Sequence, residues 1–351
     1  MLSTTLSSLL NPLTPAAVNA QLELPIFASS AAMRRVLDDV SRAAVSRANV
    51  IISGEPGTGH ELVAREVHRR SHSPGAPFVR VVYDVAAPEA FEFDLFGYNT
   101  AEGADRPERR AIERIGRGGH LHNALGGTIF FANLPEIPPR LQVRLARLFR
   151  SGEAVVQQVK KRIKMTVRAV AAVEQGYEEA LRAGRLHEEL FHLISGVHIE
   201  LPPLRRRSED IPALATFLLN ESCRGAGLPL KQLSSSAQQL LSALPWHGNA
   251  VELRRLLSEL AQRSRGEVID LNDVLGTIQI DGRAKQFATG GTLREARARF
   301  EREYIVAVVE QHHGRIPEAA KTLGVQRPNL YRKLRRMNVS KLSRKTSTRQ
   351  S

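Results

Sequence analysis

The chain has 351 residues, of which 42% are hydrophobic, and a formal net charge of +14. It is too long for one ordinary domain, so two or three domains are expected, and no apolar run is long enough to span a membrane. The single cysteine, Cys223, cannot form an internal disulfide, which indicates that the chain is in a reducing cytoplasm. Cys223 itself is expected to be a small, buried apolar residue.

Positive charge is concentrated near the C-terminus. Residues 290–351 contain fifteen Arg and Lys against five Asp and Glu, a net charge of +10, which leaves +4 for the other 289 residues. This distribution predicts a polyanionic partner, most simply nucleic acid, because neutralising phosphates releases counterions. The final residues, 339–351, are typical of a solvated basic tail.

The N-terminal residues, 1–26, are rich in Ser, Thr, Pro, Leu and Ala and are expected to be a disordered leader. They lack the basic region and cleavage site of a secretory signal. An amphipathic helix is predicted next, because apolar residues recur at helical spacing within "AAMRRVLDDVSRAAV".

Strand and helix patterns then alternate. Four short apolar runs read as buried strands: "ANVIISG", "PFVRVVYDV", "GGTIFFANL" and "MTVRAVAAV". The first is followed by a glycine-rich turn that opens onto a helix. Strands that alternate with helices predict an α/β fold with a parallel sheet covered on both faces.

Beyond residue 203 no further strand is predicted. Three helical patterns, at about 209–222, 234–244 and 249–264, predict a small helical domain over residues 204–280. Residues 281–291 have the composition of a linker.

The segment 292–338 predicts an all-α helix-turn-helix domain. A long first helix is expected to have one apolar stripe, made of Leu293, Ala296, Phe300, Tyr304 and Val308. Two short helices follow, with Pro317 and Pro328 in their first turns and Gly324 between them. Ala319 and Ala320 are small enough to let the two short helices approach closely, and this pattern is typical of a helix-turn-helix.

The second short helix is predicted to be the recognition helix. Its N-terminal end is expected to enter the major groove, where Gln or Asn pairs with adenine and Arg with guanine; the residues are Gln326, Arg327 and Asn329. Phosphate contacts are expected from Tyr331, Arg332, Lys333, Arg335 and Arg336. Leu330 and Leu334 should point into the core. A two-fold dimer would read an inverted repeat in double-stranded DNA with half-sites roughly 34 Å apart.

Seven segments, in order, resemble the bacterial enhancer-binding regulators of sigma-54 RNA polymerase, which join an AAA+ ATPase to a Fis-type helix-turn-helix. They are "GEPGTGHELVAREVH", "DLFGY", "GGTIFF", "AGRLHEELFH", "IELPPLRRRSEDIPALA", "WHGNAVELRRLL" and "AAKTLGVQRPNLYRKL". The resemblance covers about residues 27–338. It implies an AAA+ P-loop core at 27–203, a helical lid at 204–280 and the Fis-type domain at 292–338.

The P-loop departs from the pattern that binds nucleotide. The predicted vestigial pocket comprises Gly54, Gly57, Thr58, Gly59, His60, Glu61, Ala132 and Asn133. A working P-loop needs a lysine that reaches the β and γ phosphates, and His60 stands in that position. A mostly neutral imidazole is shorter, so affinity for nucleotide should fall steeply. The loop glycines are explained equally well by the tight strand-to-helix turn.

The resemblance implies an aspartate and a glutamate at the end of the third strand, which hold magnesium and activate water. Ala132 and Asn133 stand there instead, and neither supplies a carboxylate. The family's two arginine fingers fall on His187 and Leu193, and its two sensor positions fall on Glu174 and Val251. The combined losses predict that the domain does not hydrolyse ATP.

The sigma-contacting loop of the family, with the motif GAFTGA, is also absent after "DLFG". The chain reads "YNTAEGADRPERRAIERIGRGG" there. Two histidine pairs, His120 with His122 and His312 with His313, lack cysteines at zinc spacing, so no metal site is predicted.

The sequence therefore predicts a cytoplasmic, nucleoid-associated transcription regulator that binds DNA, with an inactive AAA+ domain used for self-association or partner contact. No cofactor is required, and ATP or another nucleotide as a structural ligand has little support. Two alternatives stay open. In the first, the chain is an ATP-dependent activator of sigma-54 RNA polymerase with an atypical site. In the second, it is an anti-activator that captures another regulator.

Overall fold

A computed structural model describes residues 25–98, 112–278, 305, 309, 315–323 and 325–336. The expectations for most of the leader, the linker, the basic tail and the segment that replaces the sigma-contacting loop concern residues outside these ranges. The chain divides into two compact units, Met1–Thr277 and Ile278–Ser351.

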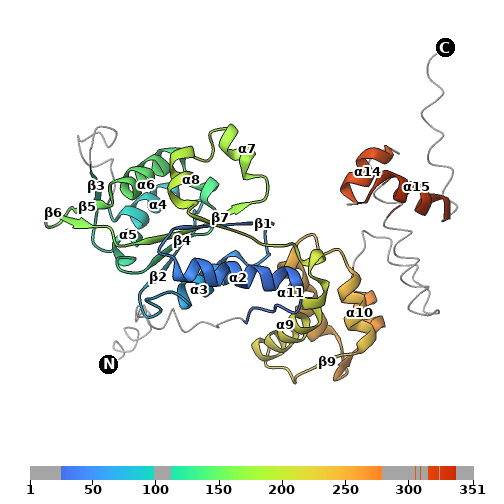
Figure 1. The fold of residues 1–351 in the computed structure, drawn as a ribbon. Helices are drawn as coiled ribbons and strands as arrows, with labels where there is room; N and C mark the ends of the chain where they lie inside the picture. Colours follow the sequence, from blue (N-terminus) through green and yellow to red (C-terminus); the bar gives the residue numbers. More distant parts are fainter. Residues whose placement is uncertain are drawn as a thin grey trace, which may run out of the picture. The chain divides into compact units, whose positions relative to one another are not determined.

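The first unit is built on a five-stranded parallel sheet (Figure 1). Its strands, in the order β2-β4-β7-β1-β8, are Phe78–Val81, Thr128–Phe131, Arg168–Glu174, Val50–Gly54 and Val197–Glu200. The four strands predicted from the sequence are present, and the edge strand β8 was not predicted. The α/β class is thereby confirmed.

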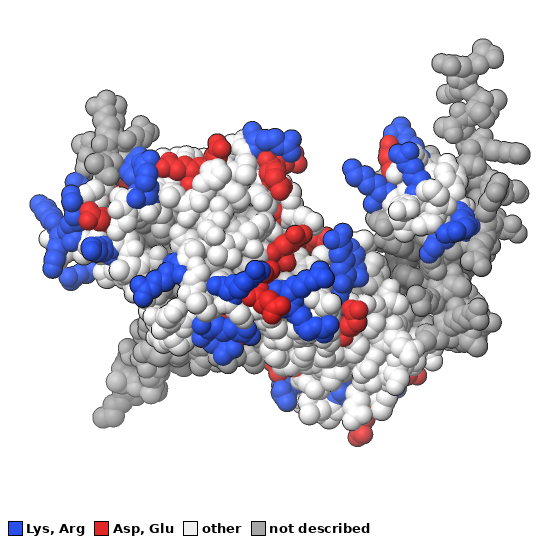
Figure 2. Space-filling model, in the orientation of Figure 1, with Lys and Arg blue, Asp and Glu red and all other residues white. Residues whose placement is uncertain are grey.

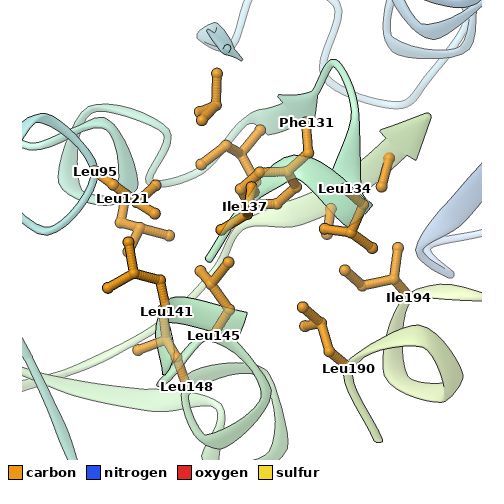
Figure 3. Close-up of a cluster of buried hydrophobic side chains, with 14 of the residues drawn as sticks. Leu95, Leu121, Phe131, Leu134, Ile137, Leu141, Leu145, Leu148, Leu190 and Ile194 are labelled. Atoms are coloured by element: carbon orange, nitrogen blue, oxygen red, sulfur yellow. The ribbon is translucent and has the colours of Figure 1, made fainter. Parts of the chain in front are cut away.

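Helices cover both faces of this sheet. On one face, α2 (Ala31–Val45) and α3 (His60–Arg69) pack against Val50 and Ile52 of β1. On the other face, Ile51 of the same strand joins a cluster with Phe131 and with leucines from several helices, of which Figure 3 shows the centre. These helices are α4 (Pro88–Phe96), α5 (His120–Asn123), α6 (Pro139–Ser151), α7 (Tyr177–Arg182) and α8 (Glu188–Ile194). Because alternate residues of β1 are buried on opposite faces, the strand reads as one continuous apolar run.

A second, three-stranded sheet stands beside this core. It consists of β3 (Glu113–Ile115), β5 (Glu153–Val156) and β6 (Lys161–Lys164), in the order β3-β5-β6. The β3–β5 pair is parallel, whereas β5 and β6 form an antiparallel hairpin. The sequence did not predict this sheet.

A buried ion network ties this second sheet to α4 and α6. The guanidinium of Arg144 contacts Glu92 at 2.7 Å and Glu113 at 3.1 Å, and it donates a hydrogen bond to the Tyr98 hydroxyl at 2.9 Å. It also lies over the ring of Phe96, 3.6 Å from the centroid. Glu113 is fully buried, and burying a carboxylate is costly unless it is paired and hydrogen-bonded, as it is here.

Residues 204–277 form the predicted helical lid. Its helices are α9 (Ile211–Gly225), α10 (Ser235–Ala243), α11 (Asn249–Arg263) and α12 (Leu271–Thr277), preceded by the 3-10 turns η4 (Leu204–Arg206) and η5 (Ser208–Asp210). The prediction that strands end before the lid is wrong in one detail. Two-residue strands β9 (Gln232–Leu233) and β10 (Val268–Ile269) pair in parallel, and they are too short to leave a pattern in the sequence. Cys223 is buried as a free thiol, as predicted.

The described part of the second unit holds the two short helices α14 (Ile316–Thr322) and α15 (Arg327–Arg336). Ala319 and Ala320 are buried between them, and Leu330 is fully buried, as predicted. Ile305 and Val309 pack into the same cluster. The residues of the predicted apolar stripe, 293–308, lie outside the described ranges apart from Ile305, which is not one of its members.

No helix among the described residues is both long and apolar enough to cross a membrane. Within the same residues no group of three His, Cys, Asp or Glu side chains is placed to hold a metal ion. His312 and His313 lie outside them.

Candidate nucleotide pocket and DNA-binding helix

The loop between β1 and α3 has the backbone shape of a P-loop. Gly57 and Gly59 have φ angles of 80° and 110°, a left-handed conformation that favours glycine. A Cβ on Gly57 would lie 2.8 Å from the backbone oxygen of Gly248. The hydroxyl of Thr58 donates to the Glu55 backbone oxygen at 2.7 Å, which closes the turn. The tight turn therefore accounts for the glycines without a ligand.

His60 begins α3 at the position of the P-loop lysine. Burial lowers the pKa of its imidazole to about 4, and the backbone of Gly54 opposes this shift only in part. The buried Nε2 atom has no hydrogen-bond partner among the described residues. At neutral pH the side chain is therefore uncharged and cannot attract a phosphate as a lysine does.

Glu61 follows His60 and faces two arginines. Its carboxylate pairs with Arg65 of the same helix at 2.8 Å and with Arg80 of β2 at 2.7 Å. These pairs direct the carboxylate along the outside of α3.

The end of β4 lies at the same edge of the sheet as the P-loop. Phe131 is the last strand residue and pairs with Ala171 of β7, which in turn pairs with Ile51 of β1. Ala132 extends the pairing of β4 with β2, because its backbone N–H donates to the Val81 oxygen at 2.9 Å. Asn133 precedes the short turn η3 (Leu134–Glu136), and its buried Oδ1 has no hydrogen-bond partner among the described residues. This edge thus presents an amide and a methyl group where two carboxylates would be needed for hydrolysis.

The remaining positions implied by the family resemblance are His187, Leu193, Glu174 and Val251. The Nδ1 atom of His187 accepts from the Leu190 backbone N–H at 3.3 Å and caps α8, and Leu193 packs against the core cluster. Glu174 ends β7 directly beside Gly54. Val251 is 66% exposed on α11, with its Cγ2 3.2 Å from the position that a Cβ on Gly57 would take.

Contacts between the lid and the P-loop were not predicted. Asn249, at the start of α11, donates from Nδ2 to the Glu55 carboxylate at 3.1 Å and to the Pro56 oxygen at 3.0 Å. Its Oδ1 accepts from the Leu204 backbone N–H at 2.8 Å. Arg205 donates to both oxygens of the Glu55 carboxylate, at 2.5 and 2.8 Å. The hydrogen bond from Arg205, with that from Asn249, lowers the pKa of Glu55.

Arg207 adds a second connection between the lid and the loop. Its side chain is buried and donates to the Thr58 backbone oxygen at 2.8 Å. The motifs "LRRRSED" and "WHGN" carry these residues, but only their spatial convergence on the loop shows what they contact. The P-loop is therefore held by the protein's own side chains.

The predicted DNA-binding residues lie on or just before α15. Gln326 and Arg327 are exposed at its start, and Asn329 is half-buried with its Oδ1 accepting from Arg332 at 2.7 Å. Tyr331 is exposed and Lys333 is half-buried. Arg335 and Arg336 lie in the last turn of α15, and their side chains are outside the described part. Leu330 anchors the inner face of the helix, so residues on either side of it point outward.

The fold and the loop define an AAA+ ATPase-type domain joined to a helix-turn-helix. Residues 26–200 match the sigma-54 interaction domain, residues 205–289 the AAA+ ATPase lid domain, and residues 296–337 the bacterial regulatory protein, Fis family. The chain belongs to the family of sigma-54-dependent, NtrC-like transcription regulators that bind DNA.

Several relatives match over most of their length. The chain is 30% identical over 320 residues to the nitrogen assimilation regulatory protein NtrX of Azorhizobium caulinodans, covering 88% of this chain and 68% of NtrX. It is 30% identical over 346 residues to the DNA-binding transcriptional regulator NtrC of Escherichia coli K12, covering 92% and 72%. A crystal structure of NtrX from Brucella abortus in complex with ATP is similar with a TM-score of 0.62 and 28% identity, covering 92% of this chain and 72% of that one.

ATP is the ligand of that NtrX structure, and the residues of this chain fit magnesium-bound ATP poorly. The uncharged, mostly buried His60 does not supply the cation that a triphosphate needs. Ala132 and Asn133 offer no carboxylate to magnesium, which prefers hard oxygen ligands. The loop therefore has the backbone conformation of a P-loop, but its side chains lack the charged groups that would bind a triphosphate and magnesium.

Proposed function

We propose that this chain regulates transcription by binding duplex DNA through its helix-turn-helix, and that its AAA+ domain does not hydrolyse ATP. The observation that carries the proposal is the neutral imidazole of His60 at the lysine position. In the proposed organisation the degenerate core spans 27–203, the lid 204–280 and the DNA-binding domain 292–338. The chain acts in the cytoplasm, at the nucleoid.

The neutral side chain of His60 makes phosphate binding costly. With a pKa of about 4, protonating His60 at pH 7 costs about 4 kcal/mol, at 1.36 kcal/mol for each pH unit. A triphosphate would have to supply that free energy before it gained any attraction from the imidazolium. Without carboxylates at Ala132 and Asn133, a bound triphosphate would also meet neither a magnesium ligand nor a base.

The AAA+ domain keeps its shape by other means and is proposed to serve self-association or contact with a partner. The contacts of Arg205, Arg207 and Asn249 hold the P-loop against the lid, so the pocket does not depend on nucleotide for its form. RNA polymerase and another regulator are the candidate partners besides a second copy of the chain. No cofactor is needed for this role.

The test is steady-state release of phosphate from ATP by the purified chain. The rate should equal the background without protein, and His60→Ala should leave it unchanged. A rate above background that His60→Ala or Asn133→Ala abolishes would refute the proposal. Such a result would favour an ATP-dependent activator, the alternative supported by the chain's family.

Reporter assays in cells with and without sigma-54 separate these two functions. The proposed regulator should change transcription from its target promoter in both strains, because it needs no remodelling of sigma-54 polymerase. An effect confined to the strain that contains sigma-54 would support the activator instead. Capture of another regulator that survives deletion of residues 292–338, without any change in transcription from DNA-bound chain, would support the anti-activator.

A further inference from the structure

The hairpin formed by β5, β6 and their turn, residues 153–164, is strongly basic. It contains four cations, Lys160, Lys161, Arg162 and Lys164, against one acid, Glu153, a net charge of +3. Residues 1–289 together have a net charge of only +4. The hairpin is therefore far more basic than these 289 residues are on average.

The hairpin is anchored through apolar side chains on one face and exposes its cations to solvent. Lys161, opposite the buried Val156, is exposed at the turn end of the anchored face. Ala154 and Val156 of β5 are buried in the core cluster, and Ile163 of β6 packs against it. Residues 157–162 and Lys164 are exposed. In the register of the hairpin, Arg162 lies opposite Val155 and Lys164 opposite Glu153, on the face turned away from the core. Figure 2 shows the resulting group of Lys and Arg side chains at the position of β6 in Figure 1.

No acidic side chain neutralises the lysines of the hairpin within the described ranges. Arg162 pairs with Glu153 at 3.3 Å, but among the described residues no carboxylate lies within ion-pair distance of Lys160, Lys161 or Lys164. An exposed neighbour, Arg117, adds a further cation. Its backbone N–H donates to the Gln158 side chain in the turn at 3.0 Å, which fixes the two loops together.

Lysines on an edge strand can also serve to block pairing with another sheet. That role explains Lys161 and Lys164, which lie on the edge strand β6. It does not explain Lys160, which lies in the turn with a φ of 51°, or Arg117, which comes from the loop after β3. Charge of either sign protects an edge, whereas only positive charge attracts an anion. Reversing the charge therefore separates the two roles.

We infer that this hairpin binds the phosphate backbone of duplex DNA, as a contact additional to the helix-turn-helix. The inference rests on the proposed function, in which DNA is already the partner of the chain. Flexible ammonium groups on an exposed hairpin suit phosphate contacts that do not depend on sequence. Each phosphate neutralised adds about 0.9 to the slope of log affinity against log salt concentration.

The test uses the full chain with Lys160, Lys161 and Lys164 all changed to Glu. Binding to a fluorescent duplex of random sequence is measured between about 50 and 200 mM NaCl. The salt slope should fall by about 2 to 3, and affinity at the lowest salt should drop at least tenfold. Lys→Gln at the same three positions should produce a smaller fall in affinity. Circular dichroism checks that both variants fold.

The matched control makes the same change in net charge at dispersed sites. Arg35→Glu, Arg47→Glu and Arg265→Glu alter exposed residues of α2, of the loop after it and of the lid. This triple variant should keep the wild-type salt slope to within about 1. An unchanged slope in the hairpin variant, or an equal fall in the control, would overturn the inference.

The failure of this inference is distinguishable from failure of the proposed function. If the wild-type chain binds no duplex at the lowest salt, the proposed DNA-binding function fails, and the hairpin contact with it. If the wild-type chain binds and the hairpin variant binds with the same slope, only the hairpin contact is wrong. A hairpin that captures an acidic protein while duplex binding stays unchanged counts against it in the same way.

Discussion

Replacing His60 with glutamine should make the first unit less sensitive to acid. The pKa of His60 falls from 6.5 to about 4 on folding, chiefly through burial. Between these values the unfolded chain binds a proton that the folded chain excludes, so the free energy of unfolding decreases as pH falls from about 6.5 toward 4. At pH 5 the loss attributable to His60 is about 2 kcal/mol. Glutamine stays neutral and removes this contribution.

The measurement is urea unfolding at pH 7.5 and pH 5.0, followed by the fluorescence of Trp246. This single tryptophan of the chain is buried in the lid, and its backbone oxygen accepts from Asn249 N–H, next to the P-loop. The wild type should lose about 2 kcal/mol more than His60→Gln between the two pH values. His72→Gln, which changes an exposed histidine, should behave as the wild type does. Equal losses in all three proteins would show that His60 is not held neutral and would remove the basis of the proposed inactivity.

Three further variants test other parts of the structure. Arg144→Met leaves the buried carboxylates of Glu92 and Glu113 with the longer contacts to Arg140 and Arg147, at 3.4 and 3.5 Å, and should lower the free energy of unfolding by about 3 kcal/mol; a loss under about 1 kcal/mol would contradict the network. Asn249→Ala should cost about 2–3 kcal/mol in urea unfolding, because it removes three hydrogen bonds and a residue suited to positive φ, and no measurable loss would contradict the lid contact. Leu330→Ala should reduce the helicity of the second unit, measured by circular dichroism, because Leu330 is buried in its core. Arg327→Ala should keep the helicity and weaken binding to duplex DNA. The reverse pattern would refute the assignment of Leu330 to the core and of Arg327 to the DNA contact.

The main sheet was predictable because its central strands are buried on both faces. Strands β1, β4 and β7 therefore appear as continuous apolar runs bounded by turn residues. The second sheet was not predictable for the opposite reason. In β6 only Ile163 is apolar, and its neighbours are charged, so the strand has no pattern of its own and exists through pairing with β5.

The candidate pocket, too, was predictable only in part. The residue types at His60, Ala132 and Asn133 were readable in the sequence, and with them the absence of the lysine and carboxylates that phosphoryl transfer requires. The protonation state of His60 was not readable, because it depends on burial by elements distant along the chain. The roles of Arg205, Arg207 and Asn249 likewise needed the folded lid, which brings them to the loop from about 150 to 194 residues away.

By itself, the sequence determined which chemical groups the chain possesses: a P-loop turn without its lysine, a strand end without acids, and a basic helix with a small apolar core. The tertiary structure alone decided which groups meet and which charges survive. Burial neutralises the imidazole of His60, and the pairing of β6 with β5 places exposed lysines along one hairpin. Both effects arise because solvation and charge depend on neighbours in space, and chain order specifies those neighbours only after folding.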